Sequence, residues 1–221
     1  FSGGERGDVS GSKVTWRGVR IPQLVTVRPQ QSGTLKFTVQ TKELDDFVNV
    51  NLNQTTYTLR PGAQVVADNL EQIETAGTLY KARGGLIFTQ ADIVRKGLNR
   101  VTNNEVYTVT WTVENYQNEV TDVIVKTISP LPVGAWIPES ITPASQASAI
   151  SYNQDTGEIV WTIGKLESYT GVRGGRDAIT ISFDLEAPRN NSGDLFSAPE
   201  ITGIDVFTGE TYSATGEAGR E

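Results

Sequence analysis

The side chains available for chemistry are few in kind, because the 221 residues include no Cys, His or Met. Their absence excludes disulfides, thiolate and imidazole metal sites, cysteine nucleophiles and histidine general bases. Carboxylates, Lys, Arg, Tyr, Ser and Thr remain. Glycoside hydrolysis needs two carboxyl groups that face each other across a cleft, and no aromatic-rich cleft is evident. We therefore predict no catalytic or cofactor-binding residues and no enzymatic activity.

The carboxylates cluster only weakly. Asp45 and Asp46 are adjacent in the chain. Asp184 and Glu186 are two positions apart and therefore lie on the same face of an expected strand. Calcium prefers several oxygen ligands that converge from one loop, and the sequence has no EF-hand loop. We interpret Asp184 and Glu186 as part of a solvated strand face. No metal site is predicted, with calcium as the alternative.

Three positions could contact a ligand or carry a modification. Trp136 lies between Pro132 and Pro138, in an expected loop at one end of the fold, where binding residues gather. It is the candidate for contact with a ligand or partner. Asn53 and Asn190 begin the triplets Asn-Gln-Thr and Asn-Asn-Ser, which are acceptor sequences for N-glycosylation in expected loops.

The overall charge and hydropathy narrow the class of partner. Lys and Arg number 19 and Asp and Glu 26, so the formal net charge is -7. Nucleic-acid binding favours basic stripes with interleaved aromatics, so we expect no nucleic-acid partner. No run approaches 18 apolar residues, so no transmembrane segment is expected. The chain begins at Phe1 without Met, and we expect it to be processed or a fragment.

The elements that would position these residues are strands. Apolar residues alternate with polar ones, a period of two that is typical of strands with one buried and one wet face. Turn signals such as Asp155-Thr156-Gly157 and Pro61-Gly62 separate these runs. The alternating runs are residues 34–40, 47–53, 106–113 and 178–186. Residues 89–97 fit a short helix or an irregular first strand. The pattern predicts an all-β protein of Ig-like antiparallel β-sandwich modules.

An internal repeat sets the expected domain organisation. Around Trp16 and around Trp161 the chain has an Asp, a Gly, a strand that ends on Trp, and then a Gly and a Leu. The second copy carries about ten extra residues near 187–199, an insertion that a loop tolerates. We expect residues 1–78 to be the C-terminal half of a sandwich and residues 86–214 to be a complete one. A bare half would expose apolar faces, so an upstream segment or a neighbouring chain must complete it.

The second copy resembles the DUF11 or conserved-repeat domain of bacterial and archaeal cell-surface proteins. The resemblance rests on three segments, which are residues 107–115, residues 123–132 and the Trp-Thr-Ile-Gly-Lys-Leu sequence at 161–166. It covers residues 86–212, and its back half recurs over 8–57. At the corner, Thr127 or Ser129 stands where the family has Asp. Similar surface modules contain intramolecular isopeptide bonds, for which Lys126 would be the candidate in an expected core strand.

The resemblance implies an extracellular structural protein, built of repeats, in a cell-surface adhesin or filament. Its partners would be other copies or neighbouring repeats, joined by β-strand pairing, and a host or cell-surface protein or glycan. One alternative is a filament subunit that polymerises by donor-strand exchange, a form of β-augmentation. Another is a carbohydrate-binding β-sandwich. A compact monomer with full β content would exclude donor-strand exchange.

Overall fold

The computed structural model describes residues 7–38, 53–68, 70–89 and 92–219. The chain divides into two compact units, residues 1–51 and residues 52–221. The expected boundary between the modules, at residues 78–86, therefore lies within the second unit. The expected ranges 1–78 and 86–214 stay predictions as domain boundaries.

The first unit has little regular structure. Strand β1 (Asp8–Ser10) pairs antiparallel with β2 (Lys13–Thr15), and a 3-10 turn, η1, spans Pro22–Leu24. Trp16 follows β2, and its ring lies 5.9 Å from that of Phe37. No apolar side chain among residues 7–38 is buried, so Trp16 fills no inter-sheet core in this part of the chain.

The alternating run at residues 34–40 does not form the expected strand over its residues 34–37. Alternation favours a strand only where a neighbouring strand supplies the hydrogen bonds, and no described strand is paired with residues 34–37. The run at 47–53 lies outside the described residues except for Asn53, which is in a turn.

The second unit begins with two separate ribbons. Strand β3 (Thr58–Leu59) pairs with β6 (Tyr80–Lys81), and β4 (Gly62–Ala67) pairs with β5 (Leu70–Ala76). Each is a two-stranded antiparallel sheet. The described residues before the sandwich thus form three two-stranded ribbons.

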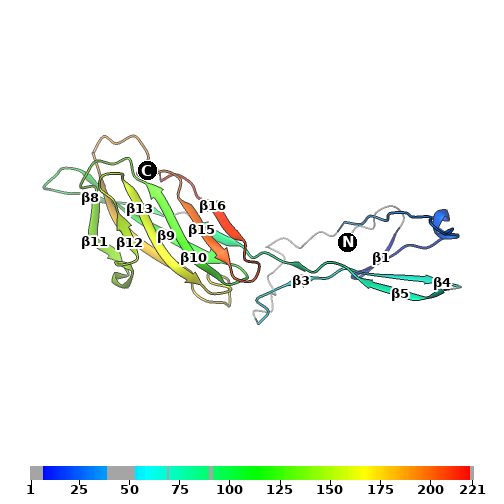
Figure 1. The fold of residues 1–221 in the computed structure, drawn as a ribbon. Helices are drawn as coiled ribbons and strands as arrows, with labels where there is room; N and C mark the ends of the chain where they lie inside the picture. Colours follow the sequence, from blue (N-terminus) through cyan, green and yellow to red (C-terminus); the bar gives the residue numbers. More distant parts are fainter. Residues whose placement is uncertain (1–6, 39–52, 69, 90–91, 220–221) are drawn as a thin grey trace. The chain divides into compact units, whose positions relative to one another are not determined.

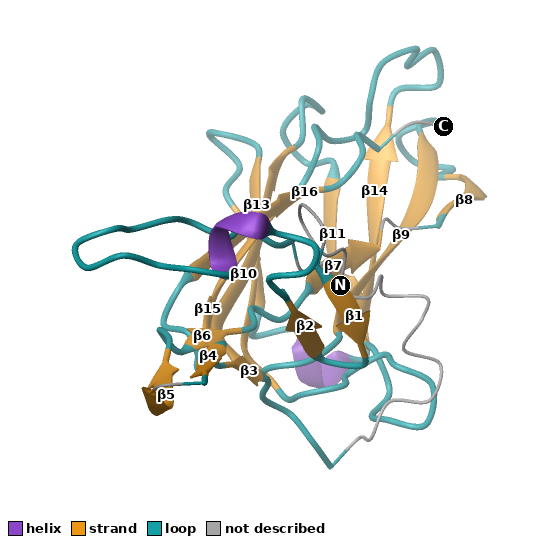
Figure 2. Ribbon diagram, turned by 90° about the vertical axis from the view of Figure 1, so that its right-hand side faces the viewer, coloured by secondary structure: helices purple, strands orange, loops and turns teal. Residues whose placement is uncertain are grey.

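The rest of the second unit is an antiparallel β-sandwich, which confirms the predicted fold class (Figures 1 and 2). One sheet has the order β12-β13-β10-β15-β16, and the other has β11-β14-β9-β7, with β8 also paired to β9. The strands of the first sheet are β10 (Val120–Ile128), β12 (Ile150–Tyr152), β13 (Glu158–Leu166), β15 (Glu200–Asp205) and β16 (Thr211–Thr215). Those of the second are β7 (Leu86–Thr89), β8 (Ile93–Leu98), β9 (Glu105–Asn115), β11 (Trp136–Thr142) and β14 (Ile179–Ala187). A 3-10 turn, η3 (Ala144–Gln146), follows β11.

The period-two pattern is borne out most fully in β9. Its odd-numbered residues are buried and its even-numbered residues are half-buried, in strict alternation over eleven positions. Of the described residues in 89–97, Thr89 ends β7 and residues 93–97 belong to β8, so the irregular strand is right and the helix is wrong there. β9 pairs with both: β8 along residues 105–109 and β7 along residues 112–115.

The core between the sheets is aromatic. The Trp111 ring lies 6.4 Å from Trp161, 5.0 Å from Phe183 and 5.8 Å from Phe196, and all four are fully buried. Edge-to-face contacts of this kind add to the free energy of burial. Phe196 comes from the extra residues near 187–199, which were expected to form a loop. That segment instead contributes two buried side chains, Leu195 and Phe196, to the core.

Candidate functional site

The structure places Trp136 in a strand instead of a loop. Trp136 begins β11 and is half-buried. Its ring lies 4.9 Å from Phe183 and is stacked on Tyr152, with centroids 5.6 Å apart and planes at 19°. Burial raises the pKa of the Tyr152 hydroxyl. Because these rings cover part of the indole, Trp136 supports the edge of the core. Its contact with a ligand stays a prediction.

Both candidate glycosylation sites lie at the surface. Asn53 is exposed in a turn, and Asn190 is exposed in the turn that follows β14. An acceptor Asn must be accessible in a loop. The structure brings neither residue to Trp136 in a common site.

The carboxylates of Asp184 and Glu186 are buried, so the prediction of a solvated strand face is wrong. Asp184 accepts hydrogen bonds from Lys96 Nζ at 2.8 Å and from Thr108 Oγ1 at 2.7 Å. The Glu186 carboxylate accepts bonds from three side chains of loop 99–104, namely Asn99 at 2.8 Å, Asn104 at 3.1 Å and Thr102. Side chains of β8 and of loop 99–104 therefore reach the outer-face carboxylates of β14.

Asp184 and Glu186 form no metal site among the described residues. The second pair, Asp45 and Asp46, lies outside the described residues. Among the residues that the structure describes, no group of three His, Cys, Asp or Glu side chains could hold a metal ion. Lys126 is exposed on β10, so the expectation of a buried lysine for an isopeptide bond is wrong. The same β10 corner carries Thr127 and Ser129, whose hydroxyls donate to the carbonyls of Ser197 at 2.5 Å and Leu195 at 2.8 Å.

A groove of about 620 Å³ lies at one end of the sandwich. Its lining includes Glu119, Glu167 and Tyr169. Lys165 lies 2.8 Å from the Glu119 carboxylate and 2.9 Å from that of Glu167, and these bonds raise the pKa of its ammonium group. The bond from Lys165 lowers the pKa of Glu167. One exposed cation is thus shared by both acids, an arrangement that contributes little stability.

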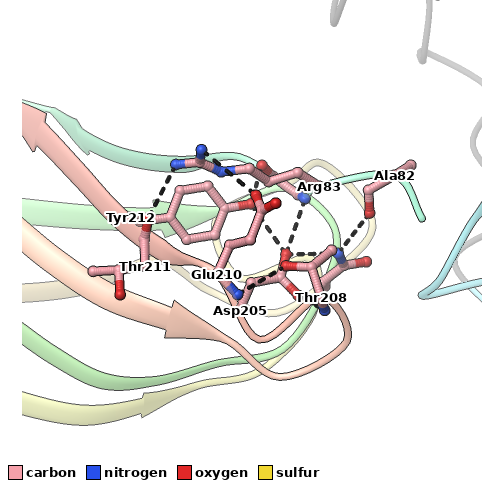
Figure 3. A network of polar contacts seen from close by, with 9 residues as sticks. Ala82, Arg83, Asp205, Thr208, Glu210, Thr211 and Tyr212 are labelled. Atoms are coloured by element: carbon pink, nitrogen blue, oxygen red, sulfur yellow. Dashed lines mark hydrogen bonds and ion pairs between the residues drawn. The ribbon is translucent and has the colours of Figure 1, made fainter. Parts of the chain in front are cut away.

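The most connected polar cluster surrounds Asp205 at the end of β15 (Figure 3). Asp205 is fully buried. Its Oδ1 accepts bonds from the backbone amides of Phe207 at 2.8 Å and Thr208 at 2.9 Å. Its Oδ2 accepts bonds from Asn118 Nδ2 at 2.8 Å and the Gly84 amide at 3.2 Å. A buried carboxylate thus receives at least four hydrogen bonds.

These bonds hold residues 80–85, here called the junction segment, on the sandwich. Tyr212 donates its hydroxyl to the Gly84 carbonyl and lies 3.2 Å from Asp205 Oδ2. Asn118 also donates to the Ala82 carbonyl at 3.0 Å. A β-carbon on Gly84 would lie 2.9 Å from the Asn118 backbone nitrogen, so the close approach requires glycine.

Two cations of the junction segment lie over aromatic rings. The Arg83 guanidinium is 4.1 Å from the centre of the Tyr212 ring, and one of its nitrogens is 3.9 Å from the Glu210 carboxylate. Lys81 Nζ donates to the Phe207 carbonyl at 2.6 Å and lies 4.8 Å from that ring. Such contacts are worth about 0.5–1 kcal/mol each at exposed sites.

The cluster also perturbs its ionisable groups. Burial would raise the pKa of the Asp205 carboxyl, but bonds from Asn118 and the backbone amides outweigh it and lower the pKa. Burial, and then the charge of Asp205, raise the pKa of the Tyr212 hydroxyl above its ordinary value. At neutral pH Asp205 is therefore an anion and Tyr212 a neutral donor, which is what their hydrogen bonds require.

Sequence reasoning did not identify this cluster. Its members are separated by as many as 128 positions in the chain, and each is an unremarkable polar residue in its own segment. One sequence signal could have pointed to Asp205. The segment Asp205-Val-Phe-Thr-Gly-Glu210, in the turn after β15, resembles the segment Asn153-Gln-Asp-Thr-Gly-Glu158.

Comparison with known proteins adds no relative. No family model matches the chain, and a search of curated proteins finds no similar sequence. In the described residues no helix is long and apolar enough to cross a membrane.

Proposed function

We propose that the chain is a structural module of an extracellular surface protein, adhesin or filament, with no catalytic role. Its partners are neighbouring repeats or further copies of the chain, joined by β-strand pairing. The extracellular setting rests on the resemblance of residues 86–212 to surface repeats.

The sandwich supports a mechanical role, because the burial of a large aromatic core contributes to its cohesion. The chain has no cysteine, so no disulfide contributes. Trp111, Trp161 and Phe183 fill the space between the sheets, with no exposed surface on any of them. A buried aromatic side chain of this size contributes several kcal/mol, because its removal costs about 3–5 kcal/mol.

The observation that carries the proposal is the exposure of the β4–β5 ribbon. Val65 and Ile73 are directly opposite each other in its register, and their exposed fractions are 56% and 55%. Val66 beside them is 72% exposed. An isolated two-stranded ribbon is marginally stable in water, and its free strand edges are templates for another strand.

The β3–β6 ribbon has the same character. Leu59 and Tyr80 are opposite each other and are 47% and 57% exposed. Added strands would satisfy the edges and cover these side chains, as in recognition by β-augmentation. Strand pairing with a neighbouring repeat or with another copy therefore follows, and donor-strand exchange between copies is the polymerising form of the same contact.

The test is the association state of the purified chain, measured by sedimentation velocity over a hundredfold range of concentration. We expect concentration-dependent association that the paired substitution Val65→Thr with Ile73→Thr weakens at least tenfold. Threonine keeps the shape and strand preference but removes the apolar contact. The control is Val101→Thr together with Val133→Thr, at two apolar positions of the sandwich that are 93% and 74% exposed.

Two results would contradict the proposal. A chain that stays monomeric at every concentration excludes pairing between copies. If the backbone amides of β4 and β5 in that monomer also exchange slowly with solvent, the ribbon needs no partner, and pairing with a neighbouring repeat is excluded as well.

A further inference from the structure

Three hairpins of the sandwich share one six-residue loop. The loops are residues 99–104 between β8 and β9, residues 153–158 between β12 and β13, and residues 205–210 between β15 and β16. Each begins with Asn or Asp and has Thr at the fourth position. The fifth position has a positive φ in all three, at 58° for Asn103, 71° for Gly157 and 78° for Gly209.

The first residue closes each loop in the same way. Its backbone amide donates to the carbonyl of the sixth residue at 2.8–2.9 Å, and its carbonyl accepts from the amide of the fifth at 2.7–2.8 Å. Its side-chain Oδ1 accepts the amide of the third residue at 2.8–2.9 Å. The loop therefore uses one side-chain oxygen, which Asn supplies as well as Asp does.

The loops differ in what the second side-chain atom of that residue does. Asn99 Nδ2 donates to the Glu186 carboxylate at 2.8 Å, so that position needs a donor. Asn153 is exposed to solvent. Asp205 Oδ2 instead accepts bonds from the Gly84 amide and Asn118 Nδ2, so only there is a second acceptor needed.

We infer that Asp205 is a positioning residue whose second carboxylate oxygen fixes the junction segment on the sandwich. The hairpin itself does not require the charge, because loops 99–104 and 153–158 form with Asn. The charge serves the contact with residues 82–84 and Asn118. This oxygen thus helps to set the direction in which the chain leaves β6 and enters β7.

The aromatic partner completes this contact. Tyr212 lies on β16, directly after the same loop, and donates to the Gly84 carbonyl. Gly84 therefore has its amide bound by Asp205 and its carbonyl bound by Tyr212. A residue whose backbone amide and backbone carbonyl are both bound by buried side chains cannot move away without the loss of both hydrogen bonds. This inference does not depend on the proposed extracellular role.

The test is the substitution Asp205→Asn, read out by hydrogen exchange of residues 82–85 and by the rate of trypsin cleavage after Arg83. We expect the hairpin to persist, as it does with Asn153. The amide nitrogen of the new side chain is itself a donor, so it could not accept the hydrogen bonds from the Gly84 amide and Asn118 Nδ2. Exchange and cleavage at the junction segment should therefore rise at least tenfold, while exchange within β9 and β14 stays unchanged.

Two controls isolate the second oxygen. Asp155→Asn removes the same charge from an exposed position of the matching loop, and Asn153→Asp adds a second oxygen where nothing requires it. Neither should alter exchange or cleavage at residues 82–85. If Asp205→Asn does not fold, as judged by circular dichroism, Tyr212→Phe provides the same test through the Gly84 carbonyl.

The inference is overturned if folded Asp205→Asn and Tyr212→Phe both keep the exchange and cleavage rates of the parent chain. It is also overturned if Asp155→Asn raises them equally, because net charge would then be the cause.

Discussion

Replacement of Glu186 by Ala tests whether the polar layer outside β14 stabilises the sandwich. The Glu186 carboxylate is 6% exposed and accepts hydrogen bonds from Asn99, Thr102 and Asn104. A hydrogen bond to a charged group contributes about 1.5–3 kcal/mol. The three donors belong to a partly exposed loop and regain water when released, so we take about 1 kcal/mol for each.

The expected loss is therefore about 3 kcal/mol in the free energy of unfolding. For a domain of this size, 1 kcal/mol corresponds to roughly 2–4 °C, so the midpoint of thermal unfolding should fall by roughly 6–12 °C. Urea denaturation followed by tryptophan fluorescence measures the free energy directly. The matched control is Glu139→Ala, at an exposed position of β11, which should change stability by less than about 0.5 kcal/mol.

The pH dependence gives a second check on the same carboxylate. Burial would raise the pKa of Glu186, but the bonds from Thr102, Asn99 and Asn104 outweigh it and lower the pKa. A lowered pKa in the folded state stabilises the protein above the unfolded value of about 4.3, and the contribution disappears as the pH falls through the folded value. The stability difference between the parent chain and Glu186→Gln should thus shrink below about pH 4. The reasoning would be refuted if Glu186→Ala lost less than about 1 kcal/mol of unfolding free energy at pH 7 and hydrogen exchange in loop 99–104 stayed unchanged.

Three further outcomes are expected. Trp136→Ala should lower the free energy of unfolding by about 2 kcal/mol, because the half-buried ring packs on the core, and an unchanged urea midpoint would show that the packing contributes nothing. Spectrophotometric titration should show tyrosines that ionise well above the ordinary range, because burial raises the pKa of Tyr169 to about 12 and also raises the pKa of Tyr212. A tyrosine whose pKa is raised in the folded state stabilises the fold below about pH 10, and this contribution is lost as the pH rises. The free energy of unfolding of Tyr212→Phe should therefore decrease less steeply above about pH 10 than that of the parent chain. Mass spectrometry of native material should find glycans on Asn53 and Asn190, and unmodified peptides at both would remove that prediction.

The sandwich was predictable where alternation continues over a full strand. Residues 106–113 and 178–186 have one apolar face each, and these faces are the buried ones in β9 and β14. The reason is that a register slip of one residue would turn every apolar side chain to solvent. The same argument failed for residues 34–37, because their pattern is as regular but none of the described strands is paired with them.

The candidate site was less predictable, because polar residues acquire their roles from distant segments. Asp184 and Glu186 lie on the outer face of β14, where the alternating pattern predicts contact with water. Lys96 of β8 and the side chains of loop 99–104 instead bond to these two carboxylates. Trp136 is flanked by prolines and looked like a loop residue, yet Leu185 pairs with it and places it in β11.

The amino-acid sequence by itself determined which faces are apolar, which turns carry Asn, Asp or Gly, and which chemistries are excluded, because these depend on residue type and local spacing. The tertiary structure decided the role of Asp205. The same loop accepts Asn at two other places, and only the approach of Gly84 and Asn118 from remote segments gives the second carboxylate oxygen something to bind.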